Sequence, residues 1–242
     1  MGKGSKSEIT LTTISMDELQ KLTIPEVVEA VKWLKEWIQT NHPSPDDTTI
    51  YYISVVGLSP LLQHRPVLKQ TRGRQVKYDP AEEAERAAYR LPDGRLYLKH
   101  DHFRAVLRDA SIIFRGRERE AFLRSILFIR PEQIPLIDPH TGEYITKYEI
   151  FESVGMLNPR VGRVMQWRPL IRYWRADFAV ALSFGLIAKT PENLKVLPEL
   201  MQNGGLYVGV GDWRPVILKA GKVSHTGGEF GRYRVVHCSL IE

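Results

Sequence analysis

The order in which strand and helix patterns follow one another constrains the fold of this chain most strongly. Apolar residues at every second position predict strands, and apolar residues at every third or fourth position predict helices. Residues 50–58, IYYISVVGL, give the clearest strand because they are rich in β-branched and aromatic side chains. In chain order, the patterns predict strand 50–58, helix 100–114, strands 125–130 and 177–187, helix 191–203 and a terminal pair of strands.

This order, β-α-β-β-α-β, predicts an α+β fold with a ferredoxin-like, RRM-like core. In such a core both helices pack on one face of a four-stranded sheet, and the other face is open. An open face is a platform on which the bases of single-stranded nucleic acid can stack against aromatic side chains. At the C-terminal end we expect Gly204 to end the second helix and 206–210, LYVGV, to form a strand.

Further segments precede and interrupt this core. We expect residues 1–8 to form a flexible tail, 9–48 a strand and helix extension, and 49–242 the core. Residues 59–98 form a long insertion between the first strand and the first helix of the core. Pro25 begins an amphipathic helix in the extension, since proline is favoured in the first turn. The chain therefore predicts one core with two additions.

The charge balance favours a polyanionic partner. The formal net charge is +6 and the isoelectric point is about 9.4. Cys238 is the only cysteine, which excludes an intramolecular disulfide and a cysteine-based zinc site. No apolar run approaches the roughly 20 residues of a membrane span, and the N-terminus lacks the apolar segment of a signal peptide. We expect a cytoplasmic protein with no metal and no cofactor.

Basic residues gather in three segments. Residues 153–176 contain no acid, and arginines alternate there with aromatic residues, although Pro169 is expected to interrupt any strand. Arginine beside aromatic rings suits phosphate and exposed bases together. The predicted nucleic-acid contacts are Arg65, Lys69, Arg72, Arg74 and Lys77 in the insertion, Arg104 and Arg108 on the first helix, and Arg163, Trp167, Arg168, Arg172, Tyr173 and Arg175.

Each segment also has a purely structural interpretation. The arginines of 160–175 can pair with distant carboxylates while the tryptophans anchor the core. The insertion can be a solvated loop, and Arg104 and Arg108 can be an ordinary polar helix face. Gly209 and Gly211 begin a G-x-G, but position 214 is Arg and no helix pattern comes next, so the sequence argues against a dinucleotide-binding loop. A hairpin with close backbone packing explains these glycines equally well.

The topology, the basic insertion and the glycine-rich segment after the second helix together resemble the RAMP superfamily. These RRM-like proteins form the crRNA-binding backbone of CRISPR effector complexes. The resemblance implies that the 59–98 insertion is a thumb and that the glycine-rich turn lies against the nucleic-acid backbone. It points to the insertion, to the helix start Lys99–Arg104, and to Gly205, Gly209, Gly211, Arg214, Gly231 and Arg232.

The chain also resembles uncharacterised phage and prophage proteins. The similar segments are SPLLQHR (59–65), DPAEEAERAAYRLPDGRLYL (79–98), and VGVGDWRP followed by FGRY. A phage setting implies the host cytoplasm and favours single-stranded DNA, whereas the CRISPR resemblance favours RNA. The helix start KHDHF lacks the small-residue run of many backbone subunits, and the 9–47 region has no counterpart in them.

We predict a non-catalytic protein that binds single-stranded DNA or RNA and that self-associates into a filament or ring. One alternative is a metal-independent endoribonuclease, because some RAMP relatives cut RNA with a histidine near the first helix. His100 and His102 occupy that place, and His64 is a third candidate. The other alternative is a phage structural or assembly protein whose helix with Trp33 and Trp37 docks on a neighbour.

Overall fold

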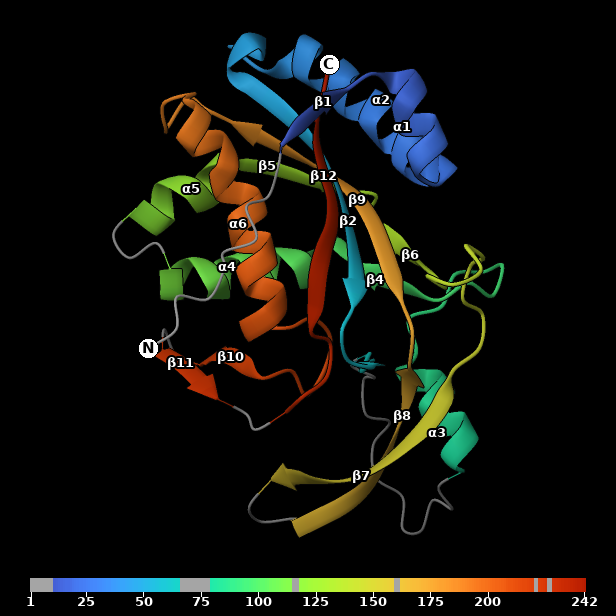
Figure 1. Cartoon of the computed structure of the whole chain (residues 1–242). Coiled ribbons are helices and arrows are strands. Elements are labelled where there is room, and N and C mark those ends of the chain that lie inside the picture. Colours follow the sequence, from blue (N-terminus) through green and yellow to red (C-terminus); the bar gives the residue numbers. More distant parts are fainter. Residues whose placement is uncertain (1–10, 66–78, 115–117, 159–161, 220–221, 226–227) are drawn as a thin grey trace, which may run out of the picture.

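The computed structural model describes residues 11–65, 79–114, 118–158, 162–219, 222–225 and 228–242 (Figure 1). The central sheet is built from β2 (Thr48–Gly57), β9 (Arg175–Ser183), β12 (Tyr233–Ile241) and β5 (Ile126–Arg130). Their order is β12-β2-β9-β5, and every neighbouring pair is antiparallel. Helix α4 (His100–Phe114) joins β2 to β5, and α6 (Pro191–Tyr207) joins β9 to β12. This connectivity is that of a ferredoxin-like α+β core, as the sequence predicts.

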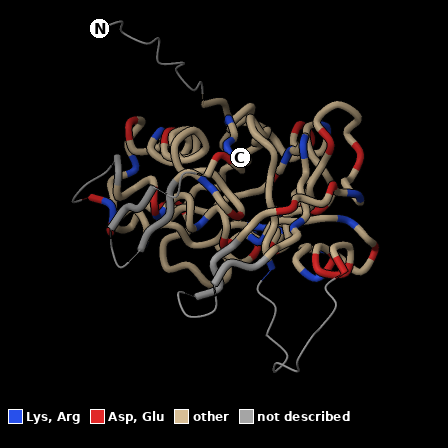
Figure 2. Tube along the Cα trace, turned by 90° about the horizontal axis from the view of Figure 1, so that it is seen from below, with Lys and Arg blue, Asp and Glu red and all other residues tan. Residues whose placement is uncertain are grey.

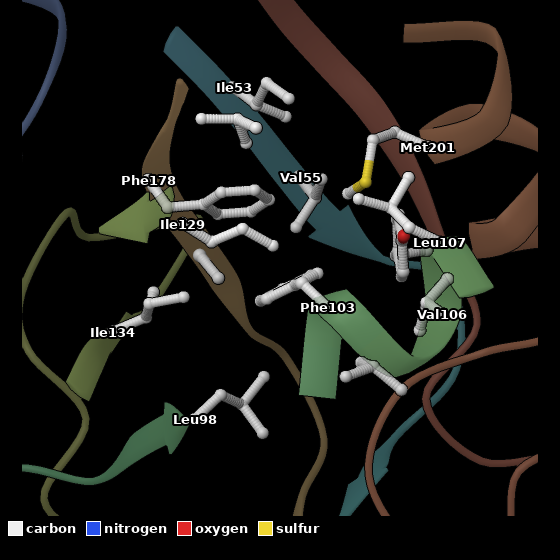
Figure 3. Close-up of a cluster of buried hydrophobic side chains, with 14 of the residues drawn as sticks. Ile53, Val55, Leu98, Phe103, Val106, Leu107, Ile129, Ile134, Phe178 and Met201 are labelled. Carbon is white, nitrogen blue, oxygen red and sulfur yellow. The ribbon is translucent and has the colours of Figure 1, made fainter. Parts of the chain in front are cut away.

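Helices α4 and α6 pack on one face of this sheet and form the main hydrophobic core with it (Figure 3). Ile53 and Val55 point from β2 toward Phe103 and Leu107 of α4, while Phe178 stacks on Phe103 with ring centroids 4.3 Å apart. Because successive side chains of a strand point to opposite faces, every second residue of β2 enters this core. The core fixes the start of α4 against the sheet.

The opposite face of the sheet is covered, which corrects the expectation of an open platform. Helices α1 (Met16–Leu22) and α2 (Pro25–Asn41) lie across it (Figure 1). The apolar stripe of α2 packs there on Ile50 and Tyr52, the β2 residues that point away from α4. Both faces of β2 are therefore buried. An amphipathic helix needs an apolar partner, and the second face of the sheet supplies it.

Other strands enlarge the structure around this core. In the main sheet, β1 (Thr12–Ile14) pairs with β12 in parallel, β6 (Gln133–Ile137) pairs with β9, and β4 (Tyr97–Lys99) pairs with β6. A separate sheet has the order β3 (Leu61–Leu62), β8 (Gly162–Ile171), β7 (Glu149–Asn158), and its β7–β8 hairpin projects from the body (Figure 1). The remaining elements are η1 (Pro45–Asp47), α3 (Pro80–Ala87), α5 (Arg119–Ser125) and the hairpin β10 (Val216–Lys219) and β11 (Lys222–His225). None of the described helices is long and apolar enough to cross a bilayer.

The prediction that Gly204 ends the second helix is wrong. Helix α6 continues to Tyr207, so residues 206–210 do not form a strand. A Cβ on Gly204 would lie 2.6 Å from Val106 Cγ1 of α4, and a Cβ on Gly205 would collide with the carbonyl oxygen of Tyr233. The two glycines therefore let α6 approach its neighbours closely, and this packing outweighs their low helix propensity.

Two other expectations about strands are also wrong. Strand β8 runs through Pro169. The carbonyl of Pro169 accepts a hydrogen bond of 3.0 Å from the Gln63 N–H, so this contact does not need the N–H that proline lacks. Strand β9 ends at Ser183, and the chain turns before α6 although its residues remain apolar. Apolar character alone thus overestimates strand length.

Candidate functional site

Four segments that are distant in the sequence meet beside the end of the central sheet that is lower in Figure 1. They are the first residues of the insertion, the start of α4, strand β8 and the glycine-rich turn. The Asp212 N–H donates to the Leu62 carbonyl at 2.9 Å, and Gly231 N–H donates to the Pro60 carbonyl at 2.8 Å. Arg168 Nη1 lies 2.7 Å from Asp212 Oδ2. We call this region the turn site and define it as Gln63, His64, Arg65, Lys99, His102, Arg168 and residues 209–213.

The glycines of the turn serve close backbone packing. Gly209 and Gly211 have φ values of +75° and +82°, a region that favours glycine. A Cβ on Gly211 would lie 2.6 Å from Leu61 Cδ1, so β3 and the turn touch directly. The N–H of Gly209 donates to the Gly204 carbonyl at 2.8 Å, and that of Val210 donates to Gly231 at 2.9 Å. These donors are used within the protein, so close backbone packing explains the glycines, although the turn is not a hairpin because residues 206–210 form no strand.

Arg214 holds the turn onto α4 rather than facing solvent. Its Nη2 lies 2.8 Å from Asp109 Oδ2, and both side chains are buried. Burial lowers the pKa of Arg214, while the charge of Asp109 opposes that shift. Arg108 Nε lies 2.9 Å from the other oxygen of Asp109. Arg108 and Arg214 therefore share one buried carboxylate.

A cavity of about 80 Å³ opens in the turn site. It is lined by Gln63, His64, Tyr89, Leu98, His102, Gly211 and Asp212. The Nδ1 atom of His102 is buried without a hydrogen-bond partner among the described residues. Burial, followed by the charge of Arg214, lowers the pKa of His102 to about 4. His102 is therefore neutral at pH 7 and can offer one donor and one acceptor.

Asp212 is the acidic centre of the cavity. Its Oδ2 lies 3.4 Å from His64 Nδ1, besides its contact with Arg168. Burial by itself raises the pKa of Asp212, but the hydrogen bond from His64 and the charge of Arg168 outweigh it, so the pKa lies below its ordinary value. Asp212 is thus ionised at neutral pH and fixes both His64 and Arg168.

Two cations of the turn site, Arg65 and Lys99, are exposed. Lys99 Nζ lies 5.7 Å from the centre of the Tyr89 ring. Neither Arg65 nor Lys99 forms an ion pair with a carboxylate in the part of the chain that the structure describes. Arg104 and Arg232 instead donate to the backbone carbonyls of Leu127, at 3.4 Å, and Leu206, at 2.6 Å. Within the described part of the turn site, Arg65 and Lys99 are thus the exposed cations without an ion pair.

The structure divides the Arg-rich segment 160–175 instead of gathering it in one strip. Arg168 belongs to the turn site, whereas Arg172 pairs with Glu149 at 2.6 Å. Arg175 pairs with buried Asp177 at 2.5 Å and donates to the Leu22 carbonyl of α1 at 3.1 Å, so it belongs to the covered face.

The aromatic residues of this segment also have different surroundings. Trp167 donates to Glu152 at 3.2 Å on the β7–β8 hairpin, and Tyr173 is exposed beside His140. Trp174 is fully buried. The interpretation in which arginines pair with carboxylates and a tryptophan anchors the core therefore describes Arg168, Arg172, Arg175 and Trp174.

The remaining predicted residues lie outside the described part of the chain or away from the cavity. Lys69, Arg72, Arg74 and Lys77 lie outside the described residues; the backbone of Arg163 lies in β8, and its side chain is outside the described part. His100 Nε2 lies 3.1 Å from Asp101 Oδ1, away from the cavity that His64 and His102 share. Among the described residues, no group of three His, Cys, Asp or Glu side chains is placed to hold a metal ion.

An aromatic cluster beside the turn site was not predicted from the sequence. It consists of Trp213 in the turn, Phe151 on β7 and Phe230 in the loop before β12. Trp213 is 40% exposed. Trp-Arg-Pro occurs at 167–169 and again at 213–215, and this repetition is the sequence signal that draws attention to Trp213.

Positive and negative residues are interspersed along the described chain (Figure 2). In Figure 2, short blue and red stretches are scattered over the described trace, and on helix α3 Arg86 pairs with Glu82. The net positive charge is therefore not concentrated in a single strip of the described residues.

Similarity to known proteins was found among solved structures. No protein-family model and no curated protein matches this chain. Among 28 matching chains of solved structures is one from the cryo-EM structure of the Type III-B Cmr-beta bound to cognate target RNA. It aligns with a TM-score of 0.48 at 10% sequence identity, covering 94% of this chain and 73% of that chain. The ferredoxin-like assignment rests on the strand order and connectivity of this chain itself.

Proposed function

We propose that this protein binds single-stranded nucleic acid at the turn site without cutting it, and that the basic insertion acts as a thumb beside that site. The observation that carries the proposal is that four segments far apart in the sequence lie together. They are the insertion just after β3, the start of α4, strand β8 and the glycine-rich turn. Arg65 and Lys99 are exposed there, and the insertion continues directly from Arg65.

The chemistry of this place suits a flexible polyanion better than a compact ligand. The cavity of about 80 Å³ is too small for a whole nucleotide, so a strand would lie across its mouth. Exposed cations supply sequence-independent attraction to phosphates. Self-association, a phage origin and the choice between DNA and RNA stay predictions.

Fluorescence anisotropy with single-stranded DNA, single-stranded RNA and duplex over a salt series tests the proposal. We expect micromolar or tighter binding of single strands at low salt. The logarithm of the binding constant should fall with the logarithm of the salt concentration, with a slope of about −0.7 per phosphate contact. Lys99→Glu should weaken binding and reduce the slope. Lys32→Glu on α2 makes the same charge change on the opposite face and should have a smaller effect. Equal losses in both variants, or no binding of single strands, would contradict the proposal.

A second function, metal-independent endoribonuclease activity, is favoured by one specific observation. His64, held by Asp212, and neutral His102 line the same cavity. A histidine held by a carboxylate is suited to accept a proton from a 2′-hydroxyl. Labelled RNA incubated in chelator should then yield 2′,3′-cyclic phosphate products that are lost in His64→Ala and His102→Ala and retained in His100→Ala. Intact RNA with the wild-type protein contradicts this second function.

A further inference from the structure

Trp213 has an unusual backbone conformation for a bulky residue. Its φ is +49°, and among the described residues it is the one non-glycine residue with a positive φ. The left-handed region is unfavourable for an L-residue with a large side chain, so the surrounding structure must impose it. Backbone strain of this kind is concentrated at functional sites.

The neighbours of Trp213 impose this conformation. The side chain of Asp212 points to Arg168 of β8, and its N–H is bonded to Leu62. The side chain of Arg214 points to Asp109 inside the protein. On the far side, a Cβ on Gly228 would collide with the Trp213 carbonyl, so the chain before β12 crosses directly over the turn. Both flanking side chains are anchored inward, and the indole between them is turned toward solvent.

Two phenylalanines support the indole from the protein side. The Trp213 and Phe230 rings are 6.2 Å apart with an interplanar angle of 27°, and the Phe151 ring meets Trp213 edge-on at 6.1 Å. Phe151 and Phe230 also contact each other at 5.2 Å. The indole is therefore held in place by a small aromatic cluster while 40% of the residue remains exposed.

Trp33 gives an internal comparison. It is also 40% exposed, but the Arg130 guanidinium lies over its ring at 4.8 Å and Phe128 meets it edge-on at 5.3 Å. In the described part of the chain, no cation lies over the ring of Trp213. At equal exposure, a cation therefore covers the ring of Trp33, whereas the described contacts of the Trp213 ring are with Phe151 and Phe230.

We propose that Trp213, supported by Phe151 and Phe230, stacks on one unpaired nucleobase of the bound strand. The inference rests on the proposed function and assigns the base-contacting group of that site. An indole face matches any base because every base has a flat π-surface, and a ring already fixed loses little rotational freedom on binding. Sequence preference at this position should therefore be weak.

The test uses the full chain with a short oligothymidylate and a matched strand that contains abasic residues. Trp213→Gly removes the ring and suits the positive φ, so the fold should be retained, which thermal unfolding checks. We expect Trp213→Gly to weaken oligothymidylate binding about 5- to 150-fold, the range for loss of one stacked base. Trp33→Ala, the control, should change it far less. The abasic strand should bind wild type and Trp213→Gly alike.

The outcomes separate the two proposals. If wild type binds both strands equally well, or if Trp213→Gly binds oligothymidylate as tightly as wild type, the stacking inference is overturned while the proposed function stands. If Trp213→Gly weakens the binding of both strands to the same degree, the ring acts through the structure of the turn, and the inference is again overturned. If wild type binds neither strand, the proposed function fails and the inference with it.

Discussion

Arg214 and Asp109 form a buried ion pair in which Arg214 Nη2 lies 2.8 Å from Asp109 Oδ2. Arg214 comes from the glycine-rich turn and Asp109 from the middle of α4, so the pair ties the turn to the helix that packs on the sheet. Arg214 Nη1 also donates to the Gly209 carbonyl at 3.3 Å. One guanidinium therefore fixes the start of the turn and its attachment to the core together.

Arg214→Ala should destabilise the protein strongly. It leaves the carboxylate of Asp109 buried without its main partner, and breaking a buried ion pair from one side costs about 3–5 kcal/mol. The midpoint of urea unfolding measures the loss. Arg172→Ala removes an exposed partner of Glu149 and is the control, for which we expect an almost unchanged midpoint. Similar midpoints for the two variants would contradict a structural role of the Arg214–Asp109 pair.

Gly205→Ala should also lower the free energy of unfolding. The added methyl group would collide with the carbonyl oxygen and the ring of Tyr233, and backbone on β12 cannot move aside cheaply. Overpacking of this kind costs about 1–3 kcal/mol. Gly185→Ala is the matched control, because the nearest atom to its added Cβ would be Ser183 Oγ at an ordinary 3.6 Å. Chemical denaturation of both variants decides whether α6 needs a glycine at this crossing.

The sequence predicted the ferredoxin-like core because its evidence is local. The apolar alternation of 50–58 and the helical stripe of 100–114 each lie within one element, and their order alone defines the topology. The covered sheet face was not predictable in the same way. The stripe of α2 shows that this helix needs an apolar partner, but it does not say which surface supplies one. Here the partner is the face with Ile50 and Tyr52.

The candidate site was harder to predict because ion pairing joins distant residues. The composition of 160–175 identified arginines next to tryptophans, but it could not show that Asp212, Glu149 and Asp177 bind three of those arginines. The resemblance to the RAMP superfamily pointed to the insertion, the helix start and the glycine-rich turn together, and in the structure Leu62 and Pro60 of the insertion accept hydrogen bonds from Asp212 and Gly231. The aromatic cluster of Trp213 joins the turn, β7 and the loop before β12, and the repeated Trp-Arg-Pro does not show that these segments meet.

Acid should destabilise the protein through His102. Its pKa is about 4 in the folded protein, whereas an unfolded histidine has a pKa of about 6.5. Between these values the unfolded chain binds a proton that the folded chain does not, so stability falls as the pH decreases from about 6.5 to about 4. The full difference is roughly 3 kcal/mol. His102→Gln should lose this part of the pH dependence in urea unfolding at several pH values, and His100→Gln should retain it.

Leu34→Ala tests whether helix α2 is an integral part of the fold. Leu34 is fully buried between α2 and the second face of the sheet, in the cluster that contains Ile50 and Tyr52. Removing a buried leucine side chain costs its transfer free energy plus a term for the cavity, about 2–5 kcal/mol. Lys32→Ala changes an exposed residue of the same helix that forms an exposed ion pair with Glu29, and it should have little effect on the unfolding midpoint. If Leu34→Ala were as stable as Lys32→Ala, α2 would be loosely attached, and the sheet face beneath it would again be available as a binding platform.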